Sequence, residues 1–167
     1  MGMRLSVTTA VEEDAAEIAA LRNRVAEDLT VRYGTGPWSG NTTERGVLRD
    51  MRTSQLVILR RGKRIVASLL LQKKKPWAID VSYFTAVERP IYLLSMNVDP
   101  KLQRQGVGGY LLNAAKKVAQ AAEYRAIRLD AFDAKAGAEG FYAKCGYREV
   151  GRVTYRKAPL VYFELVL

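Results

Sequence analysis

Apolar residues recur along the chain at the two periods that are typical of strands and helices. Short alternating segments and apolar runs bounded by turn residues predict strands. On this basis we expect strands over residues 3–8, 55–60, 65–72, 92–98, 126–132, 149–156 and 160–167. Helical spacing of apolar residues predicts helices over about 11–32, 43–52, 110–123 and 137–144. The segment 77–87 fits either a strand or a lid-like segment.

Several residues predict where these elements begin and end, and which face of the first helix is exposed to solvent. Thr9 and Glu12 have the spacing of a capping box before the first helix, Thr43 can cap the second, and Gly146 is expected to end the last. The final two strands are expected to join at a turn over 157–159. The charged residues of the first helix predict a solvated face: Glu13, Asp14, Glu17, Arg22 and Arg24.

Composition is that of an ordinary globular protein. The 167 residues are 49% hydrophobic and 26% charged, and no repeat or linker interrupts them, so we expect one domain over 1–167. No apolar run approaches the roughly 20 residues that span a bilayer, and the N-terminus lacks the apolar core of a signal peptide. A single cysteine, Cys145, excludes an intrachain disulfide and favours a cytoplasmic location.

The chain has no histidine, which excludes whole classes of site. A Ser–His–Asp triad, a Cys–His pair and a histidine-based metal site are ruled out, and we expect no metal. Proton transfer must use Tyr, Asp, Glu, Lys, Cys or water. The net charge of +10 fits plain solubility, attraction to polyanions such as nucleic acid, or a polyphosphate ligand, and charge alone does not separate these.

The stretch 92–112 has the arrangement that binds phosphates. An apolar, strand-like run ends at Asp99-Pro100, a basic glycine-rich turn follows over 103–109, and a helix then begins. Backbone N–H groups at a helix N-terminus lack partners and favour negative charge, and glycines let the backbone approach a ligand. The turn is not a Walker A loop, because no Gly-Lys-Ser/Thr follows, and it fits the Rossmann fingerprint poorly.

Two motifs together resemble one family. Gln103-x-x-Gly106-x-Gly108 lies about 34 residues ahead of Phe141-Tyr142-Ala143-Lys144-Cys145-Gly146-Tyr147. The first resembles motif A of the GNAT family of acyl-CoA-dependent N-acetyltransferases, and the second is similar to that family's late Y-x-K-x-G-F segment. The resemblance covers about residues 3–167. It implies an α+β, three-layer GNAT-type fold, with a mixed, largely antiparallel sheet of about seven strands and helices on both faces.

The resemblance also implies where acetyl-CoA binds. Its pyrophosphate would lie on the loop amides and its pantetheine arm along the bulged fourth strand, after which the sheet splays. The implied cofactor-binding residues are Met96, Asn97, Val98, Arg104, Gln105, Gly106, Val107, Gly108 and Gly109. Lys135 stands where many relatives carry an asparagine that contacts the cofactor, and we include it.

Tyr142 matches the family tyrosine that protonates the leaving thiolate, a role that suits a phenol. Its alternative is a core aromatic, for which Phe141 is the better candidate. Many relatives carry a glutamate base on the fourth strand, whereas this chain has Leu94. The candidates for deprotonating the amine are Asp130, Glu88, Asp80, Glu44, or water held by Ser95 and Asn97. Cys145 is expected to pack rather than to carry an acyl group.

These observations favour transfer of an acetyl group from acetyl-CoA to a primary amine by direct attack. The acceptor, a small-molecule amine or a protein amine, is expected between the first two helices and the late strands. The candidate acceptor residues are Tyr33, Trp38, Tyr83, Phe84, Tyr155 and Asp130. The positive net charge argues against a polycationic acceptor unless Asp80, Glu88 and Asp130 cluster.

Two alternatives stay open at this point. The missing strand carboxylate fits a non-catalytic CoA-binding or regulatory module on the same fold. The net charge fits a nucleic-acid-binding protein, but no helix carries a basic stripe with interleaved aromatics, so this is the weaker alternative. A homodimer is possible, and no membrane partner is expected.

Overall fold

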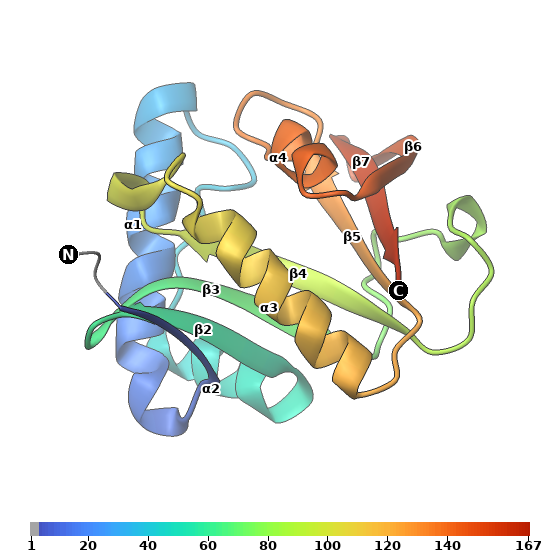
Figure 1. The fold of residues 1–167 in the computed structure, drawn as a ribbon. Helices are drawn as coiled ribbons and strands as arrows, with labels where there is room; N and C mark the ends of the chain where they lie inside the picture. The colour runs from blue at the N-terminus through green and yellow to red at the C-terminus, as the bar shows by residue number, and fades with distance from the viewer. Residues whose placement is uncertain (1–3) are drawn as a thin grey trace. The chain divides into compact units, whose positions relative to one another are not determined.

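The computed structural model describes residues 4–167, and its elements follow the predicted order (Figure 1). The strands are β1 (Leu5–Thr9), β2 (Gln55–Arg61), β3 (Arg64–Gln72), β4 (Pro90–Val98), β5 (Ala126–Phe132), β6 (Arg148–Tyr155) and β7 (Ala158–Val166). The helices are α1 (Ala15–Tyr33), α2 (Glu44–Thr53), α3 (Val107–Ala121) and α4 (Glu139–Lys144), with 3-10 turns at Glu12–Asp14, Val81–Tyr83 and Pro100–Leu102. Within residues 4–167, no helix has the length and apolar character needed to cross a membrane.

The seven strands form one mixed sheet in the order β1-β2-β3-β4-β5-β7-β6. The pairs β1–β2, β2–β3, β5–β7 and β6–β7 are antiparallel, whereas β4 and β5 are parallel. This confirms the expected α+β fold. The chain divides into two compact units: unit 1 is Met1–Leu71 with Ser95–Ala115, and unit 2 is Gln72–Leu94 with Lys116–Leu167. The expectation of one domain over 1–167 stays a prediction.

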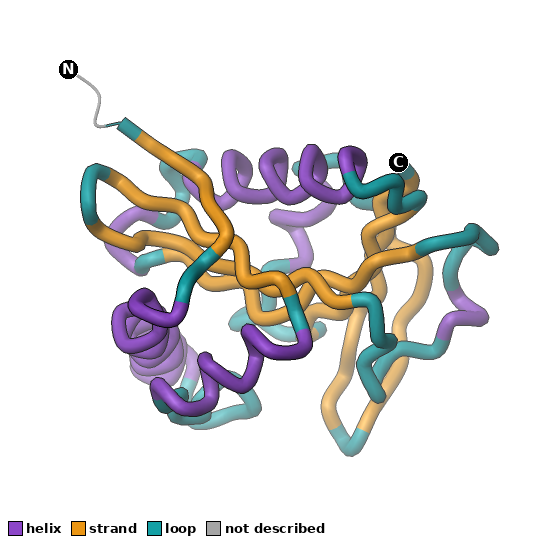
Figure 2. Tube along the Cα trace, turned by 90° about the horizontal axis from the view of Figure 1, so that it is seen from below, coloured by secondary structure: helices purple, strands orange, loops and turns teal. Residues whose placement is uncertain are grey.

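The core of unit 1 lies on both faces of its strands. Residues 56–59 of β2 and 65–71 of β3 are buried without interruption. A strand buries consecutive residues only when both of its faces are covered, because neighbouring side chains point to opposite faces. α1 and α2 cover one face of these strands, and α3 begins on the other (Figure 2).

The start of α1 differs from the prediction. Thr9 does not cap it; Thr9 ends β1, and its hydroxyl accepts a hydrogen bond from Gln55 Nε2 at 3.0 Å. The turn that precedes the helix is instead closed by the carboxylate of Asp14, which accepts from the N–H of Val11 at 3.0 Å. The capping-box spacing was therefore a chance match, because β1 extends through the position that a cap would need.

The predicted solvated face of α1 is confirmed at Glu13, which is exposed, but it is wrong for Glu17 and Arg22. Glu17 Oε1 accepts from the N–H of Ile65 at 2.8 Å, and Arg22 Nη1 donates to Asp50 Oδ2 at 2.8 Å. The side chain of Arg22 is only 10% exposed. These charged residues face the neighbouring strand and α2, where they find partners. Thr43, in contrast, caps α2 as predicted, since its hydroxyl accepts from the N–H of Gly46 at 3.0 Å.

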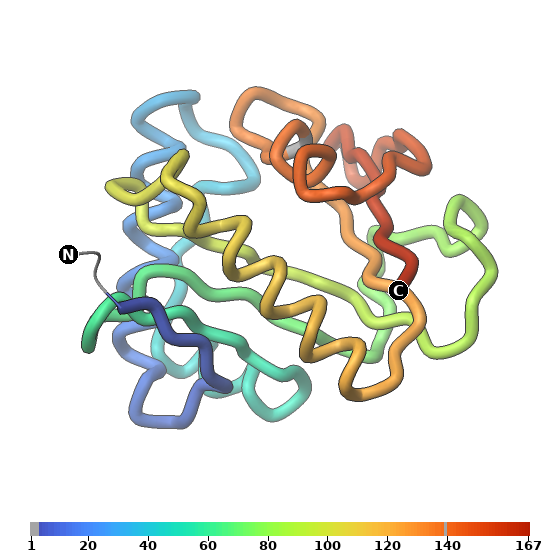
Figure 3. Tube along the Cα trace, viewed as in Figure 1, coloured from blue at the N-terminus to red at the C-terminus, as the bar shows by residue number. Residues whose placement is uncertain are grey.

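The connection between β3 and β4, residues 73–89, packs within unit 2 and is not a strand (Figure 3). Ile79 and Phe84 join Tyr92 of β4 and Tyr162 of β7 in a buried cluster, with 5.2 Å between the ring centroids of Phe84 and Tyr162. The Tyr162 hydroxyl donates to the carbonyl of Ala78 and accepts from the N–H of Asp80. The connection is thus fixed onto the sheet by apolar packing and by two hydrogen bonds.

The turn between β6 and β7 falls earlier than predicted. Arg156 and Lys157 form it, both with positive φ (48° and 68°), whereas Ala158 and Pro159 already belong to β7. A two-residue hairpin of this type favours Asn-Gly, because other L-residues are strained at positive φ.

Replacing Arg156 with asparagine and Lys157 with glycine should therefore stabilise the protein. We expect the free energy of unfolding in urea to rise by about 1–2 kcal/mol. Lys157→Ala alone, which keeps the strained backbone, serves as the control and should give no gain. An unchanged urea midpoint in the double variant would contradict the strained-turn assignment.

Candidate active site

The glycine-rich stretch forms the start of α3 in unit 1. The helix begins at Val107, three residues earlier than predicted, and the N–H of Tyr110 donates to the carbonyl of Gly106 at 3.0 Å. The N–H groups of residues 107–109 therefore have no acceptor inside the helix. Arg104 and Gly106 have φ of 62° and 83°, in the left-handed region. Where left-handed residues alternate with right-handed ones, successive backbone N–H groups point into a concavity that binds anions. This backbone fits a pyrophosphate group.

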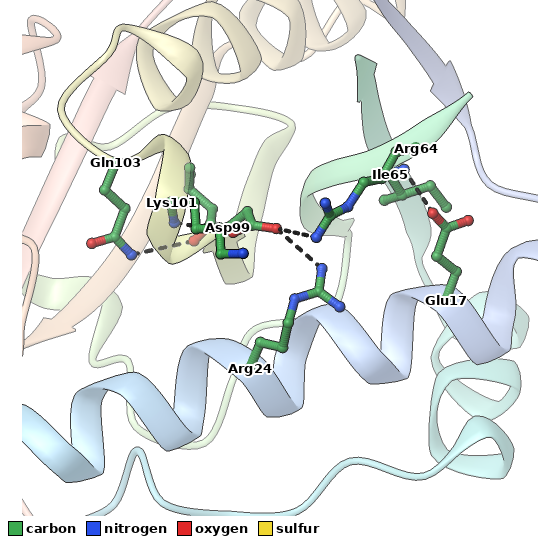
Figure 4. Close-up of polar contacts among 8 residues, drawn as sticks. Glu17, Arg24, Arg64, Ile65, Asp99, Lys101 and Gln103 are labelled. Carbon is green, nitrogen blue, oxygen red and sulfur yellow. Dashed lines mark hydrogen bonds and ion pairs between the residues drawn. The ribbon is translucent and has the colours of Figure 1, made fainter. Parts of the chain in front are cut away.

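A buried carboxylate fixes the entry to this loop (Figure 4). Asp99, 3% exposed, follows β4 and accepts from the N–H of Lys101 at 3.0 Å. Its other oxygen, Oδ2, accepts from Arg24 Nη2 at 3.2 Å and from Arg64 Nη2 at 3.1 Å. Asp99 thus ties the loop to α1 and β3. Its signal in the sequence is the Asp-Pro pair at the end of an apolar run, a pattern that by itself predicts only the end of a strand.

The side chain of Gln103, the first residue of the motif, forms hydrogen bonds within the protein. Its Nε2 donates to the carbonyl of Val98 at 3.2 Å, and its Oε1 accepts from Arg32 Nη2 at 3.3 Å. The side chain of Gln105 likewise bonds within the loop, from Nε2 to the carbonyl of Lys101 at 3.0 Å. These contacts shape the loop, so the backbone amides and Arg104 remain as the groups that could meet a phosphate.

A glycine in this loop can serve the fold or allow a ligand to approach the backbone closely, and Gly109 distinguishes these two roles. A Cβ atom built there meets no atom within 4 Å, and the residue is helical. Gly109→Ala should therefore raise the free energy of unfolding by about 0.5–1 kcal/mol. If the backbone lies against pyrophosphate, the same methyl group should weaken acetyl-CoA binding, measured by calorimetric titration. Unaltered affinity would remove residue 109 from the cofactor site.

β4 is irregular where the resemblance implies a bulge. Ser95 has a φ of 50°, and its side chain is exposed. The parallel ladder with β5 joins Pro90 to Ala126, Ile91 to Ile127 and Tyr92 to Arg128, before this irregularity. Met96, Asn97 and Val98 follow it and are half-buried. Their place after the irregularity is compatible with the strand-like pairing expected for a pantetheine arm.

Tyr142 lies on α4 in unit 2, and it is buried among aromatic rings. The centroid of its ring is 5.9 Å from that of Tyr147 and 5.8 Å from that of Phe163. Gly146, with a φ of 91°, ends the helix as predicted: its N–H donates to the carbonyl of Ala143, and the N–H of Tyr147 donates to that of Tyr142. This Schellman arrangement fixes the position of Tyr142.

The environment of Tyr142 keeps its phenol protonated. Burial raises its pKa well above the ordinary value of 10, and the negative charges of Asp130 and Cys145 raise it further. A phenol in this state is a proton donor at neutral pH and not a phenolate base. Burial also raises the pKa of the Cys145 thiol, which is unfavourable for a nucleophile.

Asp130 is the candidate carboxylate that lies near Tyr142. It stands on β5 directly opposite Tyr162 of β7, and burial raises its pKa above the ordinary 3.8. Burial raises the pKa of both Tyr142 and Tyr162, and the charge of Asp130 raises each further. Glu44 and Glu88 are exposed side chains.

The remaining predicted residues separate into surface and core positions. Lys135 is exposed in the turn before α4, a turn that requires Gly137, because a Cβ atom there would lie 1.8 Å from the carbonyl oxygen of Phe132. In unit 1, Trp38 packs over Gly36 and donates from Nε1 to the carbonyl of Gly34 at 3.0 Å. Tyr33 is exposed beneath the guanidinium of Arg32. Phe84 belongs to the core of unit 2.

Two acceptor candidates, Tyr83 and Tyr155, meet at an open pocket of about 460 Å³ in unit 2. Its wall also includes Asp80, a candidate base, and Trp77, which the sequence reasoning missed. The signal for Trp77 was an aromatic residue directly after a basic turn, in the segment whose type was ambiguous. The principal lining residues are Trp77, Asp80, Tyr83, Thr154, Tyr155 and Tyr162.

Comparison with known proteins identifies the family. Residues 19–147 match the sequence profile of the acetyltransferase (GNAT) family. The chain belongs to the GNAT family. No curated protein matches this GNAT chain significantly. Among solved structures, an N-acetyltransferase from Staphylococcus aureus Mu50 is similar, with a TM-score of 0.72, 18% identity and 98% of each chain covered.

Two further solved structures share the GNAT fold, with similar TM-scores and similarly low sequence identities. The ribosomal-protein-S18-alanine N-acetyltransferase from Escherichia coli has a TM-score of 0.72 at 15% identity, covering 98% of this chain and 94% of its own. The paiA N-acetyltransferase from Thermoplasma acidophilum, in complex with coenzyme A, has a TM-score of 0.72 at 12% identity, covering 96% and 98%. At these identities the structures support the fold alone.

Proposed function

We propose that this GNAT protein moves an acetyl group from acetyl-CoA to a primary amine by direct attack. The observation that supports the proposal is the start of α3, where backbone amides without intrahelical acceptors lie beside Arg104, an arrangement that suits pyrophosphate. Acetyl-CoA-dependent acetyl transfer is general for the family. The acceptor is proposed to be a small-molecule amine or a protein amine, and the site of action the cytoplasm, which the single cysteine favours.

The cofactor is proposed to bind through the two backbone segments that the sequence singled out. Residues 104–109 would hold the pyrophosphate by N–H groups and by the charge of Arg104. Residues 96–98 would pair with the pantetheine arm, and Lys135 is proposed to add a positive charge. The bound thioester supplies the acetyl group.

The chain's own residues are proposed to move two protons. Asp130 accepts the proton that the attacking amine must lose, directly or through water, while the new N–C bond forms. Tyr142 gives its proton to the sulfur as the C–S bond breaks. The raised pKa of Asp130 brings this carboxylate closer to neutral pH, which suits a general base. The raised pKa of Tyr142 keeps the acid protonated.

This assignment predicts a pH profile. Asp130 must be ionised to act, so kcat/KM should fall as the pH decreases through a pKa above 3.8. Tyr142 must be protonated, and its pKa is raised above 10, so it should give no loss of activity up to about pH 9. Asp130→Asn should lower kcat and remove the acidic limb. An unchanged acidic limb in this variant would exclude Asp130 as the base.

A screen of diverse amines tests the proposed reaction. Free CoA should be released only when an amine is present, and the acetylated amine should be found by mass spectrometry. The alternative, a non-catalytic CoA-binding module, predicts that acetyl-CoA raises the melting temperature without any release of CoA. If acetyl-CoA neither raises the melting temperature nor releases CoA, both the acetyltransferase and the CoA-binding module are excluded.

A further inference from the structure

The pocket lined by Trp77, Asp80, Tyr83 and Tyr155 combines exposed aromatic rings with one carboxylate. Trp77 is 81% exposed and Tyr83 is 43% exposed, which is unusual for large side chains that line a hollow. Asp80 is ionised, because hydrogen bonds from the hydroxyl and the N–H of Ser82 lower its pKa. Aromatic faces and a carboxylate together recognise organic cations.

The carboxylate of Asp80 keeps one oxygen for a ligand. Both bonds from Ser82 reach Oδ1, at 2.7 Å and 3.0 Å, and no hydrogen bond from residues 4–167 reaches Oδ2. The nearby ammonium of Lys75 is occupied elsewhere, since it donates to the carbonyls of Pro76 and Ile79 at 3.0 Å and 2.7 Å. Asp80 therefore has no direct ion pair within the described chain.

The ring of Tyr83 is held by packing, and the rings of Trp77 and Tyr155 lie beside cations. Tyr83 lies against Gly151 of β6, where a Cβ atom would come within 2.3 Å of the ring, and it stands edge-on to Tyr162 at 5.5 Å. Lys74 lies 6.0 Å from the centroid of Trp77, and Arg156 lies 5.3 Å from that of Tyr155. These pairs show that the faces of the two outer rings suit a positive charge.

Tyr162 joins this pocket to the proposed catalytic pair. It lines the pocket, and its hydroxyl accepts a hydrogen bond from the N–H of Asp80 at 3.1 Å. Asp130 stands directly opposite Tyr162 and also acts on Tyr142. Asp130 and Asp80 both adjoin Tyr162, so we place the reacting amine at Asp130 and the rest of the acceptor toward Asp80.

We propose that this pocket binds a second cationic group of the acceptor, an ammonium or guanidinium on an apolar or aromatic body. The inference rests on the proposed acetyl transfer and names its substrate class: amines with two positive charges, one lost on attack and one retained in the pocket. The neighbouring Lys74 and Arg156 add positive charge at the rim, so a single retained cation fits better than a polycation.

A fluorescence titration tests the pocket without knowledge of the natural acceptor. The chain has two tryptophans, so Trp38→Phe leaves Trp77 as the only one and makes its emission a reporter of the pocket. Benzyltrimethylammonium, which cannot be acetylated, should quench Trp77 saturably, whereas neutral benzyl alcohol and anionic phenylacetate should not. In this background, Asp80→Asn and Tyr83→Leu should each weaken binding at least about fivefold.

The control is Glu27→Gln, the same loss of charge at an exposed position of α1, which should leave the titration unchanged. The same samples are tested for stabilisation by acetyl-CoA. If acetyl-CoA binds but the cation does not, or if phenylacetate binds in its place, this inference is wrong and the proposed function stands. If benzyltrimethylammonium binds but does not compete with any amine substrate in the acetylation assay, the pocket does not bind the acceptor and this inference is wrong.

Discussion

Replacing Glu164 with alanine should lower the free energy of unfolding by about 2–3 kcal/mol. Glu164 is 1% exposed on β7 and stands directly opposite Arg128 of β5 and Arg148 of β6. Its carboxylate accepts from Arg148 Nη2 at 2.8 Å and from the N–H of Thr85 at 3.1 Å. The variant would leave the guanidinium of Arg148 without its partner carboxylate. It would also release Thr85, which fixes the 73–89 connection.

Glu149→Ala is the matched control. Its carboxylate pairs with Arg152 at 2.7 Å, but both side chains are about half exposed, so we expect a loss of less than about 1 kcal/mol. Urea denaturation measures both variants. Equal small losses would mean that the Glu164 network does not hold the connection in place.

The Glu164 network should also make stability depend on pH. Burial acts to raise the pKa of Glu164, but hydrogen bonds from Thr85 and Arg148 outweigh it, so the pKa lies below the ordinary 4.5. A depressed folded-state pKa stabilises the protein above pH 4.5, and this stability is lost as the pH falls through the lower value. Glu164→Ala should flatten that acidic decline.

Tyr142→Phe should reduce kcat by about 10²–10⁴-fold, because the leaving thiolate would lose its proton donor. The ring packs against Tyr147 and Phe163, and phenylalanine keeps that packing, so acetyl-CoA binding should be preserved. Single-turnover kinetics and calorimetric titration on the same preparation separate the two effects.

Tyr147→Phe is the matched control for this experiment. Tyr147 is also buried, its pKa is also raised by burial, and its hydroxyl has no hydrogen-bond partner among residues 4–167. Removing that hydroxyl should leave kcat unchanged. If the two variants lose activity equally, the effect comes from packing and Tyr142 has no role as an acid.

The fold was predictable from sequence because its signals are local. Apolar periodicity located the seven strands and the four α-helices of residues 4–167 but not the 3-10 turns at Val81–Tyr83 and Pro100–Leu102. The glycine motif located the start of α3 to within one turn. The errors came from contacts distant in sequence. The spacing of Thr9 predicts a helix cap, but β1 continues through this residue. The sequence predicts that Glu17 and Arg22 are solvated, but they bind Ile65 and Asp50.

The parts of the candidate site that are formed by backbone groups could be predicted from the sequence, whereas the parts formed by side chains could not. The loop at 104–109 is set by glycines and a helix start, which a sequence displays. The pocket proposed for the acceptor instead depends on Trp77 and Tyr83. A 17-residue segment without strand or long-helix periodicity brings them beside β6 and β7. The same holds for Asp130, whose raised pKa arises from burial that only the folded chain provides.

Calorimetric titration with acetyl-CoA tests the central claim most directly. We predict saturable binding in the micromolar range to the wild-type chain. Gly106→Asp should bind no acetyl-CoA while remaining folded by circular dichroism, because it puts a side chain and a negative charge at a residue with a φ of 83° in the proposed pyrophosphate site. Absence of binding by the wild-type chain, or equal binding by Gly106→Asp, would contradict the account.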